Sequence, residues 1–249
     1  MTSEFNEKIP SPSVKDNQNS RRRELLRITV PIAAIPLVIA LGVLIPGGRG
    51  YNLVSIVTAI LSSLPALIAF ERGEHDAREM TALAVMSAMS ILSRIIFAPL
   101  PGFKPVAALV IITGISFGAE AGFITGSMTA IVSNVYFGQG MWTPFQMLAW
   151  GLIGFISGGV LHKSRLRLNK IILSTVGILG GVLFSLLMDI WTTLSFDGGF
   201  SFRRYLFFIA EGLPFMVLYA ASNVILLLLL APPLCRKLDR LRIKYGIFK

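Results

Sequence analysis

A glycine-punctuated segment with amide and aromatic side chains, Phe137–Met147, lies between two long apolar stretches. The amide groups of Gln139 and Gln146 can donate and accept hydrogen bonds, and Trp142 can stack on a planar ring. Connectors at a membrane surface are usually short and charged, and this one is not. The segment therefore predicts a ligand-contacting loop, with a simple turn as the alternative.

Three ionisable residues, Arg94, Asp189 and Glu211, fall inside apolar stretches. A charged group is costly within a bilayer, so each should have a charged partner or line a polar cavity. One interpretation is an interhelical salt bridge between Arg94 and one of the two carboxylates. The other is direct contact with a ligand, and a pair at the floor of a cavity could do both.

Several kinds of chemistry have no residues to support them. The sequence lacks a GxxxxGK[ST] phosphate-binding loop and an HExxH pair, and its only histidines, His75 and His162, lie in hydrophilic connecting segments. No nucleophile has a plausible base beside it. We therefore predict no catalytic residue, no metal site and no cofactor.

The composition is that of an integral membrane protein of the helical kind. Apolar residues make up 54% of the 249 residues and charged residues only 14%, whereas a soluble domain has roughly a quarter. The net charge of +10 does not indicate nucleic-acid binding, because the basic residues lie beside the ends of apolar stretches and face lipid head groups. The single cysteine, Cys235, excludes an internal disulfide.

Eight apolar segments predict an all-α protein of about eight transmembrane helices. A disordered cytoplasmic tail at 1–27 precedes them, Arg21–Arg23 being interpreted as flanking a retained first span rather than a cleaved signal. A basic cytoplasmic tail at 232–249 follows. The segments are Ile28–Ile45, Leu53–Phe70, Met80–Phe97, Pro105–Phe117, Ala121–Phe137, Pro144–Leu161, Ile171–Trp191 and Tyr205–Leu230.

The fourth and fifth segments form one nearly unbroken stretch. A single helix from Lys104 to Phe137 would be about 50 Å long, too long for a bilayer core of about 30 Å. Gly118–Gly122 therefore predicts a tight turn between two short helices, with one long kinked helix as the alternative.

Positive charge predicts the orientation. With both termini cytoplasmic, the inner segments hold 18 Lys and Arg and the outer segments hold four. The outer loops are then 99–105, 137–144 and 195–202, each rich in aromatic residues with Gly or Pro. Trp142, Trp150 and Trp191 all fall on the outer half, which predicts an outward-facing ligand site.

Small residues predict two close helix contacts. Ala84 and Ala88 stand four apart at the cytoplasmic end of the Met80–Phe97 segment, and such a face lets another helix approach closely. The cluster Gly151, Gly154, Gly158 and Gly159 predicts tight packing within the fold.

These features together resemble the substrate-specific (S) component of an energy-coupling factor (ECF) transporter. The resemblance covers Thr81–Leu230, a six-helix core at 80–231. It rests on six spans with both termini inside, on Ala84-xxx-Ala88, on Pro101–Pro105, on Ser133-Asn134 and on the blocks Phe137–Pro144 and Gln146–Gly151. The two additional N-terminal helices, within 28–70, depart from the minimal pattern.

The resemblance implies a non-catalytic cell-membrane subunit of an ATP-driven importer, which captures a vitamin on the extracellular side. It implies that Ala84 and Ala88 contact a transmembrane coupling subunit, that two ATPase subunits supply the energy, and that the subunit topples in the bilayer. Cobalamin or a related corrinoid is the expected vitamin, with riboflavin or folate as alternatives. The candidate substrate-binding residues are Arg94, Phe103, Lys104, Asn134, Gln139, Trp142, Thr143, Gln146, Trp150, Asp189, Trp191 and Glu211.

Two other classes of function stay open at this point. A membrane enzyme could use Asp189 and Glu211 as acid and base, although no paired-carboxylate motif supports it. An assembly protein without a ligand would tolerate the loss of Trp142 and Gln139.

Overall fold

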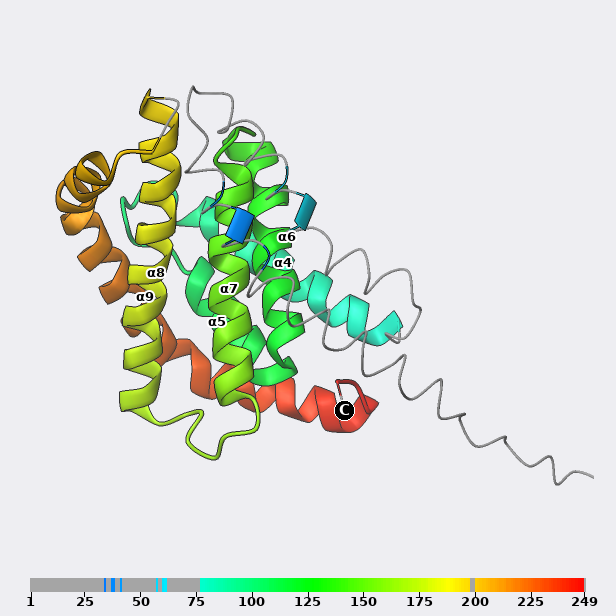
Figure 1. Cartoon of the computed structure of the whole chain (residues 1–249). Helices are drawn as coiled ribbons and strands as arrows, with labels where there is room; N and C mark the ends of the chain where they lie inside the picture. Colours follow the sequence, from blue (N-terminus) through cyan, green and yellow to red (C-terminus); the bar gives the residue numbers. More distant parts are fainter. Residues whose placement is uncertain are drawn as a thin grey trace, which may run out of the picture.

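The computed structural model describes residues 77–197 and 200–248, together with residues 34, 37, 38, 41, 57, 60 and 61. Its continuous part is all-helical, as the apolar segments predict (Figure 1). The two predicted N-terminal spans lie almost entirely outside the described residues, so the count of eight stays a prediction. The helices are α4 (Ala77–Ile96), α5 (Val106–Phe117), α6 (Ala119–Phe137), α7 (Thr143–Leu161), α8 (Lys170–Asp197) and α9 (Phe202–Tyr245).

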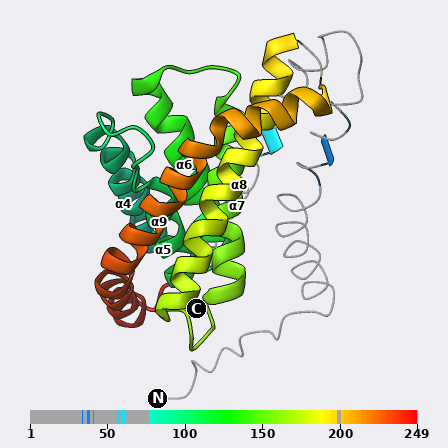
Figure 2. The ribbon, with the colours of Figure 1, turned by 90° about the vertical axis from the view of Figure 1, so that its left-hand side faces the viewer.

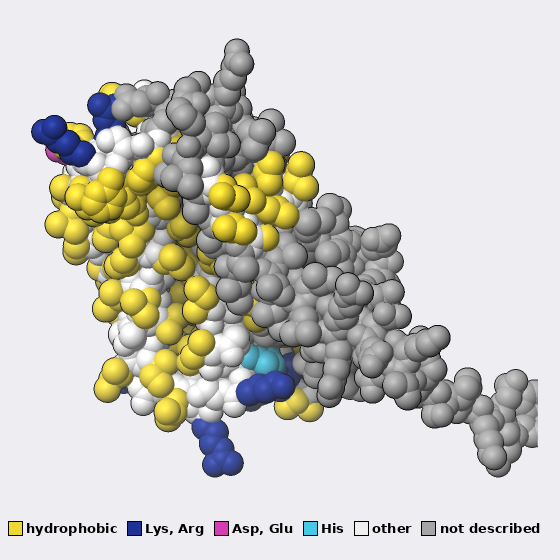
Figure 3. Space-filling model, in the orientation of Figure 1, with side chains coloured by type: hydrophobic (Ala, Val, Ile, Leu, Met, Phe, Trp, Pro, Cys, Tyr) yellow, Lys and Arg dark blue, Asp and Glu magenta, His cyan; other side chains and the backbone are white. Residues whose placement is uncertain are grey.

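Four of the described helices, α4, α7, α8 and α9, are long and apolar enough to cross a bilayer. Figure 3 shows Lys and Arg gathered at the two ends of one face, with apolar side chains between them. This distribution fits a protein that spans a membrane, because charged side chains avoid the hydrocarbon layer. The end that carries the loop between α6 and α7 is the predicted outer end, and the end that carries the loop between α7 and α8 is the predicted inner end.

Helix α5 is the centre of the bundle. All twelve of its residues are buried, and it contacts α4, α6, α7, α8 and α9. A helix that is apolar all round must be covered on all sides, which explains why the sequence shows no polar face there.

The turn between the fourth and fifth predicted spans is confirmed. Helix α5 ends at Phe117 and α6 begins at Ala119, with Gly118 between them at a φ of +104°. Side chains other than glycine rarely adopt this backbone conformation. The chain therefore reverses at one residue instead of continuing as a kinked helix.

Glycines bring α5, α6 and α7 into backbone contact, as the glycine cluster predicts. A Cβ atom at Gly154 would overlap the backbone of Gly122, and one at Gly158 would lie 2.7 Å from the Cα atom of Ala119. Gly159 is the exception, because a Cβ there would meet only the Ala119 side chain, at 4.0 Å. Close packing thus depends on part of the predicted cluster.

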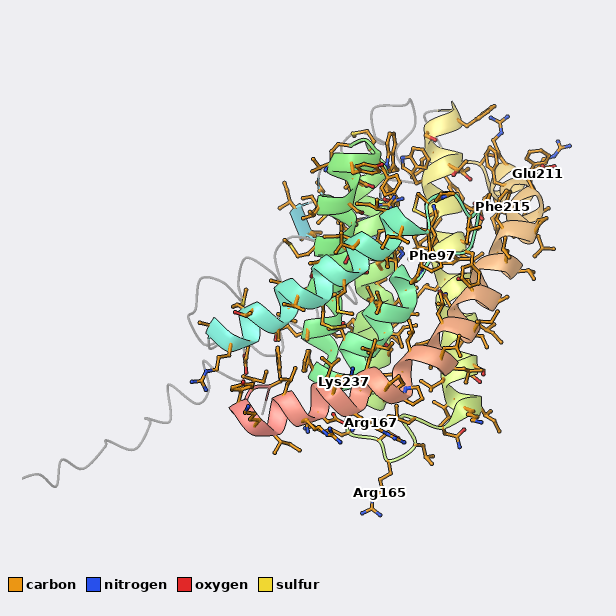
Figure 4. All side chains as sticks on the ribbon, turned by 180° about the vertical axis from the view of Figure 1, so that it is seen from behind. Phe97, Arg165, Arg167, Glu211, Phe215 and Lys237 are labelled. Carbon is orange, nitrogen blue, oxygen red and sulfur yellow. The ribbon has the colours of Figure 1, made fainter. Side chains whose placement is uncertain are left out.

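Helix α9 is 44 residues long, about 66 Å at 1.5 Å per residue, and so exceeds a bilayer core. It carries Pro214, Pro232 and Pro233, residues that kink helices. Figures 1 and 4 show the last part of α9 turning to run across the predicted inner end. Figure 2 shows the earlier part of α9 crossing obliquely over α8. The basic segment at 232–249 is therefore helical as far as Tyr245.

The end of the chain is fastened to the beginning of α4. The backbone N–H of Phe248 donates to Glu79 Oε1 at 2.5 Å, and the Arg78 guanidinium lies 5.7 Å from the ring centre of Tyr245. These contacts join the first and last described helices at the predicted inner end.

Candidate functional site

Arg94 lies in the last turn of α4, close to the predicted outer end, and only 6% of it is exposed. Its Nη1 donates to the Ser133 hydroxyl and, at 2.7 Å, to Asn134 Oδ1. The guanidinium also lies over two rings, 4.4 Å from the centre of Phe137 and 5.0 Å from that of Trp150. Neutral groups therefore hold Arg94 on several sides.

The predicted salt bridge of Arg94 with Asp189 or Glu211 is wrong. Among the described residues no carboxylate lies within 4 Å of the Arg94 guanidinium. The hydrogen bonds and the two aromatic faces take the place of a countercharge, since ring faces attract a desolvated cation.

Asn134 is the junction of a hydrogen-bond network that joins α6 to α7. Its Nδ2 donates to Thr143 Oγ1 and to Gln146 Oε1, both at 2.8 Å. Thr143 in turn donates to Gln139 Oε1 at 3.0 Å, and Gln139 Nε2 donates to the Ile131 carbonyl at 2.7 Å. The structure thus brings these four candidate residues together, but much of their hydrogen-bonding capacity is spent on one another.

Gly140 allows the loop to fold over itself. A Cβ atom there would overlap the Trp142 ring, so the ring packs directly onto the backbone of the loop. The glycine thereby fixes the position of Trp142, which is half-buried.

Trp142 forms an edge-to-face pair with Trp191 near the end of α8, with ring centres 5.8 Å apart and planes at 74°. The Trp191 indole N–H and one carboxylate oxygen of Asp189, Oδ2, are buried and have no hydrogen-bond partner within the described part of the chain. The Asp189 carboxylate also lies close to Gly212 of α9. Residues two apart on a helix point to different sides, so the Trp191 N–H lies on the side of α8 that faces Trp142 and the Asp189 carboxylate on the side that faces α9.

A second aromatic group lies deeper. Trp150 stacks on Phe184 with ring centres 5.4 Å apart, and its Nε1 donates to Tyr219 Oη at 3.0 Å. Phe184 and Tyr219 were not among the predicted site residues. Both occur in unbroken apolar stretches, where no polar neighbour or spacing distinguishes them from ordinary core residues.

The loop between α4 and α5 packs against α9. Gly102, at a φ of +69°, leaves no room for a Cβ because the Leu218 side chain would lie within 2.7 Å of it. Phe103 stacks on Phe97 at 5.9 Å. Burial lowers the pKa of Lys104, and the positive charge of Arg94 lowers it further. Lys104 is therefore near Arg94 and half-buried.

Three predicted residues lie away from the residues around Arg94, Asn134, Trp142 and Trp191, which we call the outer group. Glu211 is exposed, and Figure 4 shows it at the outer edge of α9, beside the equally exposed Phe215. Ala84 and Ala88 are exposed on α4, where they line a groove of about 480 Å³ between α4 and α6. This groove lies on the α4 and α6 surface and contains none of the predicted substrate-binding residues.

No group of three His, Cys, Asp or Glu side chains suited to a metal occurs in the described part of the chain. The arrangement at the predicted outer end can stack on a flat molecule and exchange hydrogen bonds with its edge. It offers no nucleophile placed beside a base.

A comparison with known families identifies the family of this chain. The model of the family described as the ECF-type riboflavin transporter, S component, matches residues 75–238. No curated protein and no solved structure matches the chain. Since the match spans about two thirds of the sequence, the chain belongs to this family and is a non-catalytic, substrate-binding membrane subunit of an ECF-type transporter.

Proposed function

We propose that this S component captures riboflavin at its predicted outer end. The observation that carries the proposal is the Trp142–Trp191 pair, in which the buried Trp191 indole N–H has no hydrogen-bond partner among the described residues. The description of the matching family names riboflavin, and this supports a flavin over the corrinoid expected from the sequence.

The chemistry of riboflavin suits the unused groups. Its fused ring is flat and can stack on indole, its ring carbonyls accept hydrogen bonds, and its ring N–H and sugar-alcohol hydroxyls donate them. We assign the Trp191 N–H and the Lys104 amine as donors to the ligand, and the Asp189 carboxylate as the acceptor. Phe103 and Trp142 supply apolar surface.

The remaining candidate residues have a supporting role in this proposal. The network of Asn134, Gln139, Thr143 and Gln146 forms a wall that holds Trp142 in place. We place Arg94 and Trp150 at the floor, because both are almost fully buried; Trp150 Nε1 and Arg94 Nη1 already have partners, whereas Arg94 Nε has none among the described residues. Glu211 is expected to contribute least, since it is exposed at the edge of α9.

Transport requires partners in addition to the ligand. Family membership implies association with a transmembrane coupling subunit and two ATPases, and we place the coupling subunit on the groove at Ala84 and Ala88. We also propose the orientation with both termini cytoplasmic, which the distribution of Lys and Arg supports.

Flavin fluorescence tests the proposed ligand site. Riboflavin is titrated against the full chain in lipid nanodiscs, and quenching reports stacking on indole. Trp191→Leu and Asp189→Asn should each weaken binding by about tenfold, equivalent to about 1.4 kcal/mol, the scale of one aromatic or charged hydrogen-bond contact. Phe215→Leu and Glu211→Gln are matched controls on α9 and should bind as wild type.

Two results would count against this assignment. Equal affinities for the site variants and the controls would remove Trp191 and Asp189 from the site. Saturable binding of cobalamin with none of riboflavin would restore the corrinoid expectation.

A further inference from the structure

The predicted inner end holds a cavity of about 840 Å³ that the vitamin site does not use. It lies between the loop that follows α7 and the last turn of α9. Five basic side chains line it, together with the apolar side chains of Ile243, Ile247 and Phe248, and no carboxylate among the described residues does. The basic residues are His162, Lys163, Arg165, Arg167 and Arg242.

Only one of these cations is paired with a carboxylate among the described residues. Arg167 Nη2 lies 2.6 Å from Asp239 Oδ2, whereas Lys163, Arg165 and Arg242 have no carboxylate within 4 Å. Figure 4 shows Arg165 and Arg167 at the same end of the molecule, and Figure 3 shows Lys and Arg side chains beside a histidine there. Among the described residues, the positive charge that lines the cavity therefore exceeds the negative charge paired with it.

His162 fixes one of these cations in place. Its Nδ1–H donates to the Ile115 carbonyl at 3.0 Å, which leaves Nε2 to accept from Arg242 Nη1 at 3.2 Å. An Nε2 that accepts from a guanidinium carries no proton, so the imidazole is neutral; burial lowers the pKa of His162, the hydrogen bond to the Ile115 carbonyl raises it, and the neighbouring cations lower it. Arg242 Nη1 also reaches the Ser116 carbonyl at 3.4 Å, and its other N–H groups stay available.

The carboxyl ends of helices explain why some of these cations lie here. Helices α5, α7 and α9 all end here, and carbonyl ends of helices favour nearby cations. Arg242 serves this purpose for α5 through the Ser116 carbonyl. Lys163 and Arg165 are exposed and line the cavity without such a contact, so helix ends do not explain their place.

We propose that this cavity binds a phosphate ester, with the head group of an anionic phospholipid as its source. Arginine and lysine are the side chains that bind phosphate oxygens. The ends of the spanning helices α7 and α8 place the cavity at head-group level, and its apolar side chains suit the glycerol and upper acyl region. The volume admits a whole head group rather than a bare phosphate alone.

Native mass spectrometry of the full chain tests the site. The protein is titrated with phosphatidylglycerol, with phosphatidylcholine and with inorganic phosphate as competitor. Lys163→Gln combined with Arg165→Gln should weaken phosphatidylglycerol binding by at least about tenfold, the effect of losing one hydrogen bond between charged groups. Arg236→Gln combined with Lys237→Gln removes the same charge from exposed positions of α9, and should change it by less than about twofold, because neither side chain lines the cavity.

The comparison separates a site from general attraction. Equal losses in the two double variants, or equal affinity for phosphatidylcholine, would overturn the proposal. Displacement of the lipid by inorganic phosphate would identify a general phosphate site, and retention of the lipid would identify a lipid site. Both of the last two results support binding of a phosphate ester in the cavity.

Discussion

At the residue scale, Arg94 links two helices through hydrogen bonds to neutral side chains rather than through an ion pair. It ties the end of α4 to the end of α6 through Ser133 and Asn134, and Trp150 of α7 lies beneath it. Its removal would leave the buried Asn134 oxygen without a donor. We therefore expect the loss of Arg94 to lower stability, whatever its effect on ligand binding.

Replacement of Arg94 tests this role. Arg94→Met should lower the free energy of unfolding by about 1.5–3 kcal/mol, the range for hydrogen bonds to charged groups. Thermal unfolding in detergent measures the change. Arg203→Met, at an exposed arginine of α9, is the control and should leave the free energy of unfolding almost unchanged. An equally small effect of Arg94→Met would show that the hydrogen bonds of Arg94 do not stabilise the fold.

The neutral state of His162 predicts a dependence of stability on pH. Its pKa is lower in the folded protein than in the unfolded chain. The unfolded chain therefore takes up the proton first as pH falls, and folding stability decreases as pH falls below the unfolded value of about 6.5. The temperature of the wild-type unfolding midpoint should decrease as the pH is lowered from about 7.5 to about 5.5, a range that brackets that pKa. His162→Gln should flatten that slope, and a slope unchanged by the substitution would contradict it.

At the scale of elements, the three-helix contact of α5, α6 and α7 depends on particular glycines. Gly154→Ala should destabilise the protein by about 1–3 kcal/mol through overpacking against the Gly122 backbone. Gly159→Ala, on the same helix but in open space, should be neutral or stabilise by up to about 1 kcal/mol. Unfolding in denaturing detergent measures both, and the same effect at both positions would disprove a specific contact.

The sequence predicts the helices well but the contacts within the outer group only in part. Apolar length and glycine position predict the α5–α6 reversal at Gly118, because bilayer thickness limits how long a helix can be. The neutral partners of Arg94 could not be predicted, since they depend on where three separate helices end relative to one another. The extension of α9 beyond Pro233 was missed for another reason: its polar residues lie at the surface rather than in an apolar run.

At the scale of the whole molecule, the proposed vitamin site and the proposed coupling groove lie at different positions along α4. Arg94 is in the last turn of the helix, and Ala84 and Ala88 are exposed nearer its beginning. One helix thus connects the proposed ligand end to the proposed partner surface. Ligand capture and partner docking should therefore be separable by substitution.

Bulky side chains in the groove test that separation. Ala84→Leu combined with Ala88→Leu should prevent close approach of a partner helix and abolish co-purification with co-expressed coupling and ATPase subunits, while vitamin binding is retained. Ala210→Leu, at an exposed alanine of α9, is the control and should co-purify normally. Undiminished recovery of the complex with the α4 variant would place the coupling surface elsewhere.

Equilibrium binding of riboflavin to the full wild-type chain in nanodiscs tests the central claim most directly. Isothermal titration, with cobalamin and folate as parallel ligands, should give saturable binding of one riboflavin per chain, and the ligand should be recovered chemically unchanged. A folded sample that binds none of the three vitamins would contradict the assignment of this chain as their capturing subunit.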